Sequence, residues 1–169
     1  MPGKLIQVAT ETVSSNVSEV DLIGTTTDDV YMVTISAMSC TSGSQTMNYR
    51  VLSSSAPDTT SNYDRAHNNF RTDTTFSNSA AQNETSSRIF SSPDINEIGS
   101  NALLYLYNFN NASQHSFITF YTANKHNSNI VLSQQGGLIH TVNQANNGIR
   151  FFMSGGSISS GTFTLYKVV

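Results

Sequence analysis

Charged side chains are scarce in this chain, at 11% of its 169 residues against roughly 25% in an ordinary soluble domain. Hydroxyl and amide side chains take their place, because 26 Ser, 19 Thr, 18 Asn and 7 Gln together fill 70 positions. Ser, Thr and Asn compete for backbone hydrogen bonds inside helices, and Thr is also β-branched. The composition therefore argues against a helical protein and favours strands and turns. Nine Phe and seven Tyr supply apolar surface for a folded core.

The chain also has no surplus of positive charge that would mark a nucleic-acid or membrane partner. Eight basic and 11 acidic residues are scattered along it and give a net charge of −3. Binding to nucleic acid or to an anionic membrane draws on clustered Lys and Arg, so we expect neither partner. Cys40 is the sole cysteine, which excludes an internal disulfide framework and a zinc site with several Cys ligands. We expect it to be a small buried or half-buried thiol.

Long apolar runs are missing as well. The first eight residues lack the apolar stretch of a secretory signal peptide, and no segment approaches the length needed to cross a bilayer. We therefore expect a protein that is made in a cytoplasm and has no membrane partner.

The sequence does contain a repeated alternation of apolar and polar residues. Within residues 29–38, for example, Tyr31, Val33, Ile35 and Ala37 share one face of an extended chain, which predicts a strand with that face in the core. The same pattern predicts strands at 5–10, 17–23, 46–52, 87–90, 102–109, 116–122, 129–133, 138–142, 149–153 and 162–168. Short strands between turn residues indicate an all-β protein, an antiparallel β-sandwich or barrel. No break in composition divides residues 1–169, so we expect a single domain.

Two turn signals bear on how the strands pair. Gln135-Gly136-Gly137 is rich in Gly, which accepts the positive φ angles of tight turns, and it predicts a break between strands 129–133 and 138–142. Asn147-Gly148 is typical of a two-residue β-hairpin. It predicts that strand 138–142 pairs with strand 149–153.

Residues 53–86 depart from this pattern, because they are polar and show little alternation of apolar and polar residues. This predicts a long polar loop, and loops of this length in compact domains are usually functional or mobile. Aromatic residues and Arg are enriched at protein interfaces, and the segment contains Tyr63, Arg65, Phe70, Arg71 and Phe76. We interpret these five residues as a candidate interface. The alternative is that the loop folds over its own sandwich.

Apolar side chains occupy both faces of two neighbouring predicted strands. Leu103, Tyr105, Tyr107 and Phe109 share one face of strand 102–109, and Leu104 and Leu106 share the other. The sequence Phe117-Ile118-Thr119-Phe120-Tyr121 follows in the next strand. This pattern predicts burial on both sides, either inside the sandwich or under a neighbouring subunit. The alternative is an exposed aromatic platform for a sugar.

The residue patterns that enzymes use are absent. His67, His115, His126 and His140 have no ligand-like companion at short spacing, and we expect each at an exposed or edge-strand position. The Gly-x-Ser-x-Gly turn of serine hydrolases and the glycine-rich phosphate loops are both missing. We therefore expect a protein without catalytic residues, cofactor or metal ion.

Two alternatives to that expectation stay open. A glycosidase needs two carboxylates that meet in space, and these can lie anywhere in the chain. Asp58, Asp64 and Asp73 share the polar segment and could hold Ca²⁺, although they match no defined calcium-loop spacing.

The order of these segments resembles a family of small tailed-bacteriophage virion proteins common in marine phages. The resemblance is carried by Ile6-Gln7-Val8-Ala9, Val17-Ser18-Glu19-Val20, Tyr31-Met32-Val33-Thr34-Ile35, Tyr49-Arg50-Val51-Leu52, Asn62-Tyr63-Asp64-Arg65, Ala102-Leu103-Leu104-Tyr105-Leu106-Tyr107-Asn108-Phe109, His115-Ser116-Phe117-Ile118 and Ser160-Gly161-Thr162-Phe163-Thr164-Leu165-Tyr166. It implies a jelly-roll β-sandwich that is built into virions as a capsid decoration, a cement protein or a fibre module.

Among these virion roles, a stand-alone domain that fills the chain fits a decoration protein best. We predict a homotrimer whose partner is the major capsid protein or another virion protein, with residues 53–86 and the aromatic strands as contact surfaces. The alternative is a head- or tail-fibre module that recognises a host-surface glycan. The closing strand has its own expectation, that Phe163 and Leu165 enter the core and seal the sandwich.

Overall fold

The computed structural model describes residues 3–93, 95 and 99–169, and every regular element among them is a β-strand. In chain order these are β1 (Leu5–Val13), β2 (Glu19–Ile23), β3 (Tyr31–Cys40), β4 (Thr46–Ser53), β5 (Ala56–Pro57), β6 (Tyr63–Arg71), β7 (Ser77–Glu84), β8 (Ser87–Ser91), β9 (Ser100–Tyr107), β10 (Ser116–His126), β11 (Ile130–His140), β12 (Gly148–Met153) and β13 (Ile158–Val168). All neighbouring strands pair in antiparallel fashion. The prediction of an all-β antiparallel protein is confirmed.

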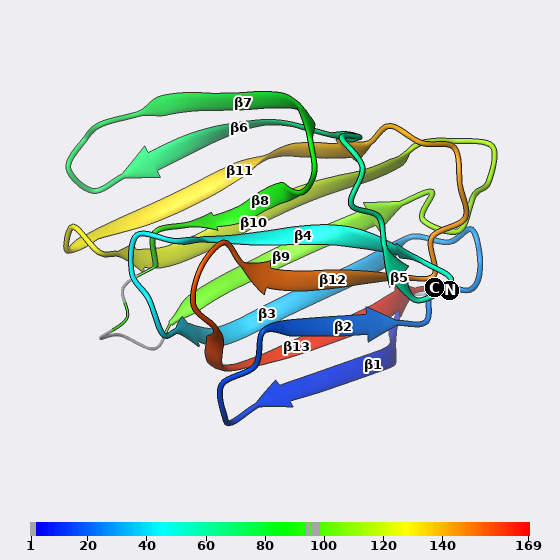
Figure 1. The fold of residues 1–169 in the computed structure, drawn as a ribbon, viewed down its shortest axis with the longest axis horizontal. Helices are drawn as coiled ribbons and strands as arrows, with labels where there is room; N and C mark the ends of the chain where they lie inside the picture. Colours follow the sequence, from blue (N-terminus) through cyan, green and yellow to red (C-terminus); the bar gives the residue numbers. More distant parts are fainter. Residues whose placement is uncertain (1–2, 94, 96–98) are drawn as a thin grey trace.

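The strands form two sheets that pack face to face (Figure 1). The larger sheet has the order β1-β13-β3-β9-β10-β11-β6-β7, and the smaller has the order β2-β12-β4-β5, with β8 also paired to β4. Within this arrangement β1, β3, β9 and β13 of one sheet alternate along the chain with β2, β4, β8 and β12 of the other, except that β4 and β8 follow one another in the same sheet. Such alternation between two four-stranded sheets is the order of a jelly roll. The fold is thus a single β-sandwich of jelly-roll type.

Two hairpins extend the larger sheet beyond the jelly roll. Strands β10 and β11 continue the sheet from β9, and β6 and β7, which are inserted in the chain between β4 and β8, add its last two strands. The β6–β7 hairpin therefore forms one edge of the larger sheet and β1 forms the other (Figure 1).

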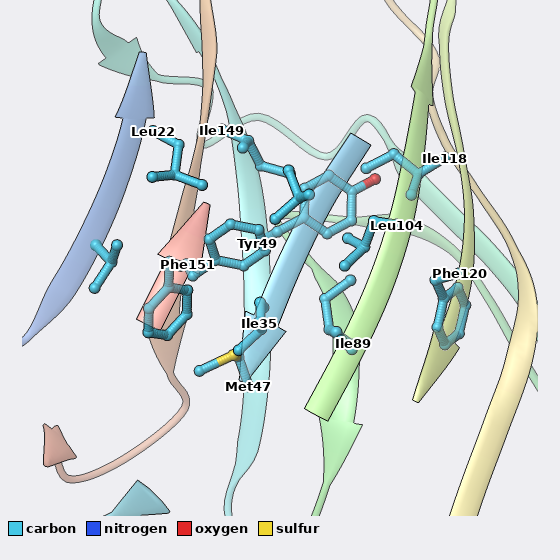
Figure 2. Packing of buried hydrophobic residues seen from close by; sticks show 14 of the residues in the cluster. Leu22, Ile35, Met47, Tyr49, Ile89, Leu104, Ile118, Phe120, Ile149 and Phe151 are labelled. Carbon is cyan, nitrogen blue, oxygen red and sulfur yellow. The ribbon is translucent and has the colours of Figure 1, made fainter. Parts of the chain in front are cut away.

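The core lies between the two sheets and is built by alternate residues of the strands. The larger sheet contributes Leu104 and Phe120 among others, and the smaller sheet contributes Leu22, Tyr49 and Phe151 (Figure 2). Each of these side chains is at most 1% exposed. Burying one such side chain stabilises the fold by about 1.5–3 kcal/mol.

Strand β13 has the role in the core that its sequence predicts. It lies between β1 and β3, and Phe163 and Leu165 are completely buried. The Phe163 ring packs against Phe151 of the other sheet, with 5.7 Å between ring centroids. The end of the chain is tied down as well, because Lys4 and Val169 exchange two backbone hydrogen bonds of 2.7 and 3.0 Å.

The prediction of a long irregular loop at residues 53–86 is wrong. The segment contains β5, β6 and β7, and β6 pairs with β11 along its whole length. Along β6 the side chains that point toward the second sheet are Tyr63, Arg65, His67, Asn69 and Arg71. Polar residues therefore take the inward positions, so the apolar alternation that marks the other strands is missing.

The predicted turn at residues 135–137 and the predicted hairpin at Asn147-Gly148 are also wrong. β11 runs unbroken through Gly136 and Gly137 and pairs with β10 and β6 in the larger sheet. β12 belongs to the smaller sheet, where Gly148 lies opposite both Ile23 and Leu52. Gly136 and Gly148 allow close packing of strands, since a Cβ atom at Gly148 would lie 2.5 Å from the Leu22 carbonyl oxygen and one at Gly136 would clash with the Ala66 carbonyl oxygen.

Strand β3 departs from its predicted alternation at one residue. Tyr31, Val33 and Ile35 face the core as expected, but Ala37 is exposed and has a φ of 53°. The ladder to β9 shifts register between Ile35 and Met38 at this β-bulge. Met38 returns to the core and is completely buried.

Candidate functional site

Two exposed phenylalanines meet at the end of the β6–β7 hairpin. Phe70 is 38% exposed and Phe76 is 68% exposed, and their rings pack edge to face with centroids 6.0 Å apart. Phe70 comes from the end of β6, and Phe76 directly precedes β7. We call these two residues the aromatic tip.

The turn that carries the aromatic tip is held in a fixed shape. Arg71 and Asp73 form a side-chain ion pair of 2.9 Å, and Asp73 also accepts a hydrogen bond of 3.1 Å from the Thr75 backbone N–H. The Thr74 N–H donates to the Arg71 carbonyl oxygen across the turn, and Thr74 has a φ of 63°. Thr72 anchors the turn to β11 through two hydrogen bonds with the Val131 backbone. Exposed ion pairs add little stability, so the effect of these contacts is mainly to order the turn.

The sequence predicted five interface residues, and the structure separates them. Phe70, Phe76 and Arg71 come together at the tip, with Arg71 half-buried on the inner side of the hairpin. Arg65 is also half-buried on the inner side, opposite Leu138 of β11. Tyr63 is completely buried in the core, so it has no surface to offer a partner.

Tyr63 has a structural role inside the fold. Its hydroxyl group donates a hydrogen bond of 2.8 Å to the Asp58 carbonyl oxygen and accepts one of 3.2 Å from the Val51 N–H. Its ring also packs 4.9 Å from the ring of His140. Burial raises the pKa of Tyr63 well above the ordinary value. The residue therefore fastens the β4–β6 connection to the core.

The outer face of the larger sheet, which points away from the smaller sheet, is hollowed beside the hairpin. One hollow of about 490 Å³ has a floor of small residues, including Ala66, Ala80 and Gly136, and a second of about 200 Å³ reaches the aromatic tip. The two share Asn68 and Asn78. We call them together the outer groove, and its outward-facing side chains are Ala66, Asn68, Phe70, Phe76, Asn78, Ala80, Thr119, Tyr121 and Gln135.

The outer groove continues into an uncharged apolar surface on β9 and β10. Phe117 is 44% exposed and Tyr121 is 56% exposed, and both lie on the outer face opposite Tyr107 and Leu103. Core side chains such as Leu104 point to the other face. Burial of both strand faces inside the sandwich is therefore wrong for Phe117 and Tyr121, whereas burial under a neighbouring subunit stays a prediction. We call this part of β9 and β10 the aromatic face.

Two of the four histidines are not at the exposed or edge-strand positions that the sequence predicted. His67 and His140 are 5% and 0% exposed and lie in the sandwich interior, which corrects the expectation of exposed or edge-strand positions for these two residues. His140 Nε2 lies 2.9 Å from the Asp58 carboxylate. Burial lowers the pKa of His140, and the nearby carboxylate only partly offsets this effect. The imidazole is therefore mainly neutral at pH 7, and its Nε2–H donates the hydrogen bond to the ionised Asp58 carboxylate.

The three carboxylates of the polar segment lie apart and have separate partners. Asp58 pairs with His140, Asp73 with Arg71, and Asp64 accepts a hydrogen bond of 2.8 Å from the Asn83 N–H. Burial raises the pKa of Asp58, but hydrogen bonds from Thr60 and His140 outweigh it and leave that pKa below the ordinary value. Among the described residues, no group of three or more His, Cys, Asp or Glu side chains has the geometry of a metal site. No stretch of the described chain forms a helix that is long and apolar enough to cross a bilayer.

The sequence analysis did not find the outer groove. Asn68, Asn78 and Gln135 come from three strands, and two of them lie in the segment that was predicted as a loop. A signal was present in the pair Gly136-Gly137, because glycines inside a strand often mark a close approach or an open space on the sheet.

Comparison of the chain with known protein families, with curated proteins and with solved structures found no match.

Proposed function

We propose that this protein is a non-enzymatic structural protein of a tailed-bacteriophage virion, specifically a decoration or cement protein that binds the assembled head and stabilises it. The observation that carries the proposal is the aromatic tip, two exposed rings at the end of an ordered hairpin. Aromatic and Arg side chains are enriched at protein interfaces and often dominate their energetics. The jelly-roll order of the strands supports the same proposal, because viral capsid domains use this fold.

The aromatic face supports a homotrimer as the bound form. Between Phe117 and Ala123 the outer face of β10 carries no charged side chain, and neither do the residues opposite it on β9 and β11. Phe117 and Tyr121 are exposed on this surface. Interfaces between subunits are depleted of charge at their centres and enriched in Tyr and Phe. Three copies around a symmetry axis also multiply weak contacts with a capsid lattice into stable attachment. We therefore assign subunit contacts to the aromatic face and lattice contacts to the aromatic tip.

Binding to heads assembled without this protein tests the proposal. The purified chain is mixed with such heads at increasing concentration and the bound fraction is measured by co-sedimentation. The proposal predicts saturable binding, and light scattering of the unbound protein gives the mass of a trimer. Absence of head binding at micromolar protein concentrations contradicts the decoration function, whichever oligomer is found.

A receptor-binding module for a host-surface glycan is the second candidate, and the outer groove favours it. An exposed ring at Tyr121 lies beside the amides of Asn68, Asn78 and Gln135. Aromatic rings stack on the apolar faces of sugars, and amides donate and accept hydrogen bonds with sugar hydroxyls. A glycan array separates the candidates. Saturable sugar binding that is lost in Tyr121→Ala favours the receptor module, and absence of sugar binding favours decoration.

A further inference from the structure

Three of the five arginines in this net-negative chain gather on one side of the β6–β7 hairpin. Arg65 and Arg71 point inward from β6, and Arg88 approaches them from β8. His67 lies between them and is 5% exposed. The inner surface of the hairpin thus concentrates positive charge, although the outer groove on its other surface has none.

Arg88 has no carboxylate partner in this cluster. Its Nη2 atom donates to the Ser79 hydroxyl at 3.0 Å and lies 3.3 Å from His67 Nε2. Among the ion pairs of the described residues, Arg71 pairs with Asp73, while Arg65 and Arg88 pair with no acid. The Nε atoms of Arg65 and Arg88 are buried and have no hydrogen-bond partner within the described structure. A guanidinium group that is removed from water without an anion carries a substantial energetic cost.

His67 is uncharged in this cluster, so it is neither an anion that could pair with Arg88 nor a further cation. Its Nε2 atom lies 3.1 Å from Gln134 Nε2, and both this amide nitrogen and Arg88 Nη2 are donors only. His67 Nε2 therefore accepts, and the ring proton is on Nδ1, which is buried without a partner in the described structure. Burial and the neighbouring Arg88 and Arg65 charges lower the pKa of His67 to about 4. Burial, together with the nearby Arg65 charge, lowers the pKa of Arg88.

An open hollow of about 310 Å³ adjoins these groups. Its wall contains two guanidinium groups, the His126 ring and several hydroxyl and amide groups. His126 Nδ1 accepts a hydrogen bond of 3.0 Å from the Ser128 N–H, so its Nε2–H remains a donor. The donors that line the hollow include Arg71, Ser77, Ser79, Arg88, Ser91 and His126. No Asp or Glu from the described residues lines it.

We propose that this inner hollow binds an oxyanion, a phosphate or sulfate group, with the guanidinium of Arg88 as its main ligand. Planar guanidinium groups bind such oxyanions through two parallel hydrogen bonds, which are among the strongest in proteins. The bound anion would offset the positive charge of the cluster and accept hydrogen bonds from the donors that line the hollow. This site is independent of the proposed virion function, because neither the aromatic tip nor the aromatic face forms it.

Titration of the full chain with inorganic phosphate and with sulfate, at constant ionic strength set by chloride, tests the site. We expect saturable binding by calorimetry, a rise in melting temperature, and a shift of the Arg88 side-chain Nε–H signal in NMR spectra of the unaltered protein. Arg88→Gln should weaken binding at least about tenfold. The control is Arg150→Gln, which removes an arginine that pairs with Asp21 and Glu19 on the smaller sheet, and it should leave binding unchanged.

The same titration identifies the source of the oxyanion. A sulfated sugar that binds more tightly than inorganic sulfate assigns the site to a sulfate ester, and equal affinities assign it to the free ion. The proposal is overturned if neither anion changes the Arg88 signal beyond the effect of chloride, or if binding persists in Arg88→Gln. The NMR readout applies even if the variant fails to fold, because it uses the unaltered protein.

Discussion

Gly136 of β11 lies directly opposite His67 of β6, so close that a Cβ atom at position 136 would lie 2.5 Å from the His67 Cβ atom. The missing side chain allows the His67 ring to lie over β11, where it contacts Gln134 and Arg88. This close approach joins the β6–β7 hairpin to the sandwich.

Replacing Gly136 by Ala should therefore destabilise the fold. The added methyl group would also meet the Ala66 carbonyl oxygen, and overpacking of this kind typically costs about 1–3 kcal/mol. Urea unfolding measures the loss. Gly137→Ala is the matched control, because a Cβ atom there has nothing within 4 Å, and its free energy of unfolding should stay within about 0.5 kcal/mol of the original. Equal effects of the two substitutions would contradict the packing at Gly136.

Tyr63→Phe should destabilise the protein without altering any surface. The change removes a buried hydroxyl group that bonds both Asp58 and Val51, and a lost buried partner costs about 1–3 kcal/mol. Thermal unfolding measures the effect. Tyr121→Phe, which changes an exposed ring, serves as the control with no measurable loss. A Tyr63→Phe protein of unchanged stability would show that these hydrogen bonds do not hold the β4–β6 connection.

Acid should weaken the fold between about pH 6.5 and pH 4. The pKa of His67 is about 4 in the folded protein, so the unfolded chain binds the proton first as the pH falls. The contribution of His67 to the free energy of unfolding is complete above pH 6.5 and is lost as the pH falls toward 4. It totals about 3 kcal/mol. His140 also has a lowered pKa and acts in the same direction as the pH falls below 6.5, whereas the lowered pKa of Asp58 adds its effect only below pH 3.8.

The variant His67→Gln isolates this contribution, because Gln keeps an acceptor for Gln134 and Arg88 but does not titrate in this range. Its free energy of unfolding should depend less steeply on pH than that of the original protein. Direct NMR titration of the His67 ring gives the folded-state pKa. A value near 6.5, or an unchanged pH dependence in the variant, would contradict the account of this residue.

Most of the sandwich could be predicted from sequence because its strands bury one apolar face. Phe163 and Leu165 of β13 show this clearly, since their alternation alone placed them in the core. The β6–β7 hairpin escaped prediction for the opposite reason. Its strands are held by pairing with β11 and by polar contacts such as the hydrogen bond between Asn69 and Gln134, and residue-level hydrophobicity does not report such contacts.

The candidate site could be predicted only in part. Phe70, Arg71 and Phe76 were found because their residue types are typical of interfaces, but the same reasoning selected Tyr63, which burial removes from the surface. The outer groove needed the strand register, which brings Asn68 beside Asn78 and Gln135. Register depends on pairing between distant segments, so local sequence patterns do not determine it.

The most direct test of the decoration function is the number of copies bound per head for protein with and without the aromatic tip. Phe70→Ser together with Phe76→Ser removes both exposed rings, and Ile23→Ser removes an exposed apolar side chain from β2 as the control. Head occupancy is measured by quantitative electrophoresis of purified particles after confirming that each variant melts like the original. The account predicts that the tip variant loses at least about nine tenths of its occupancy, corresponding to an interface hot spot, while the control binds fully. Full occupancy by a folded tip variant would contradict it.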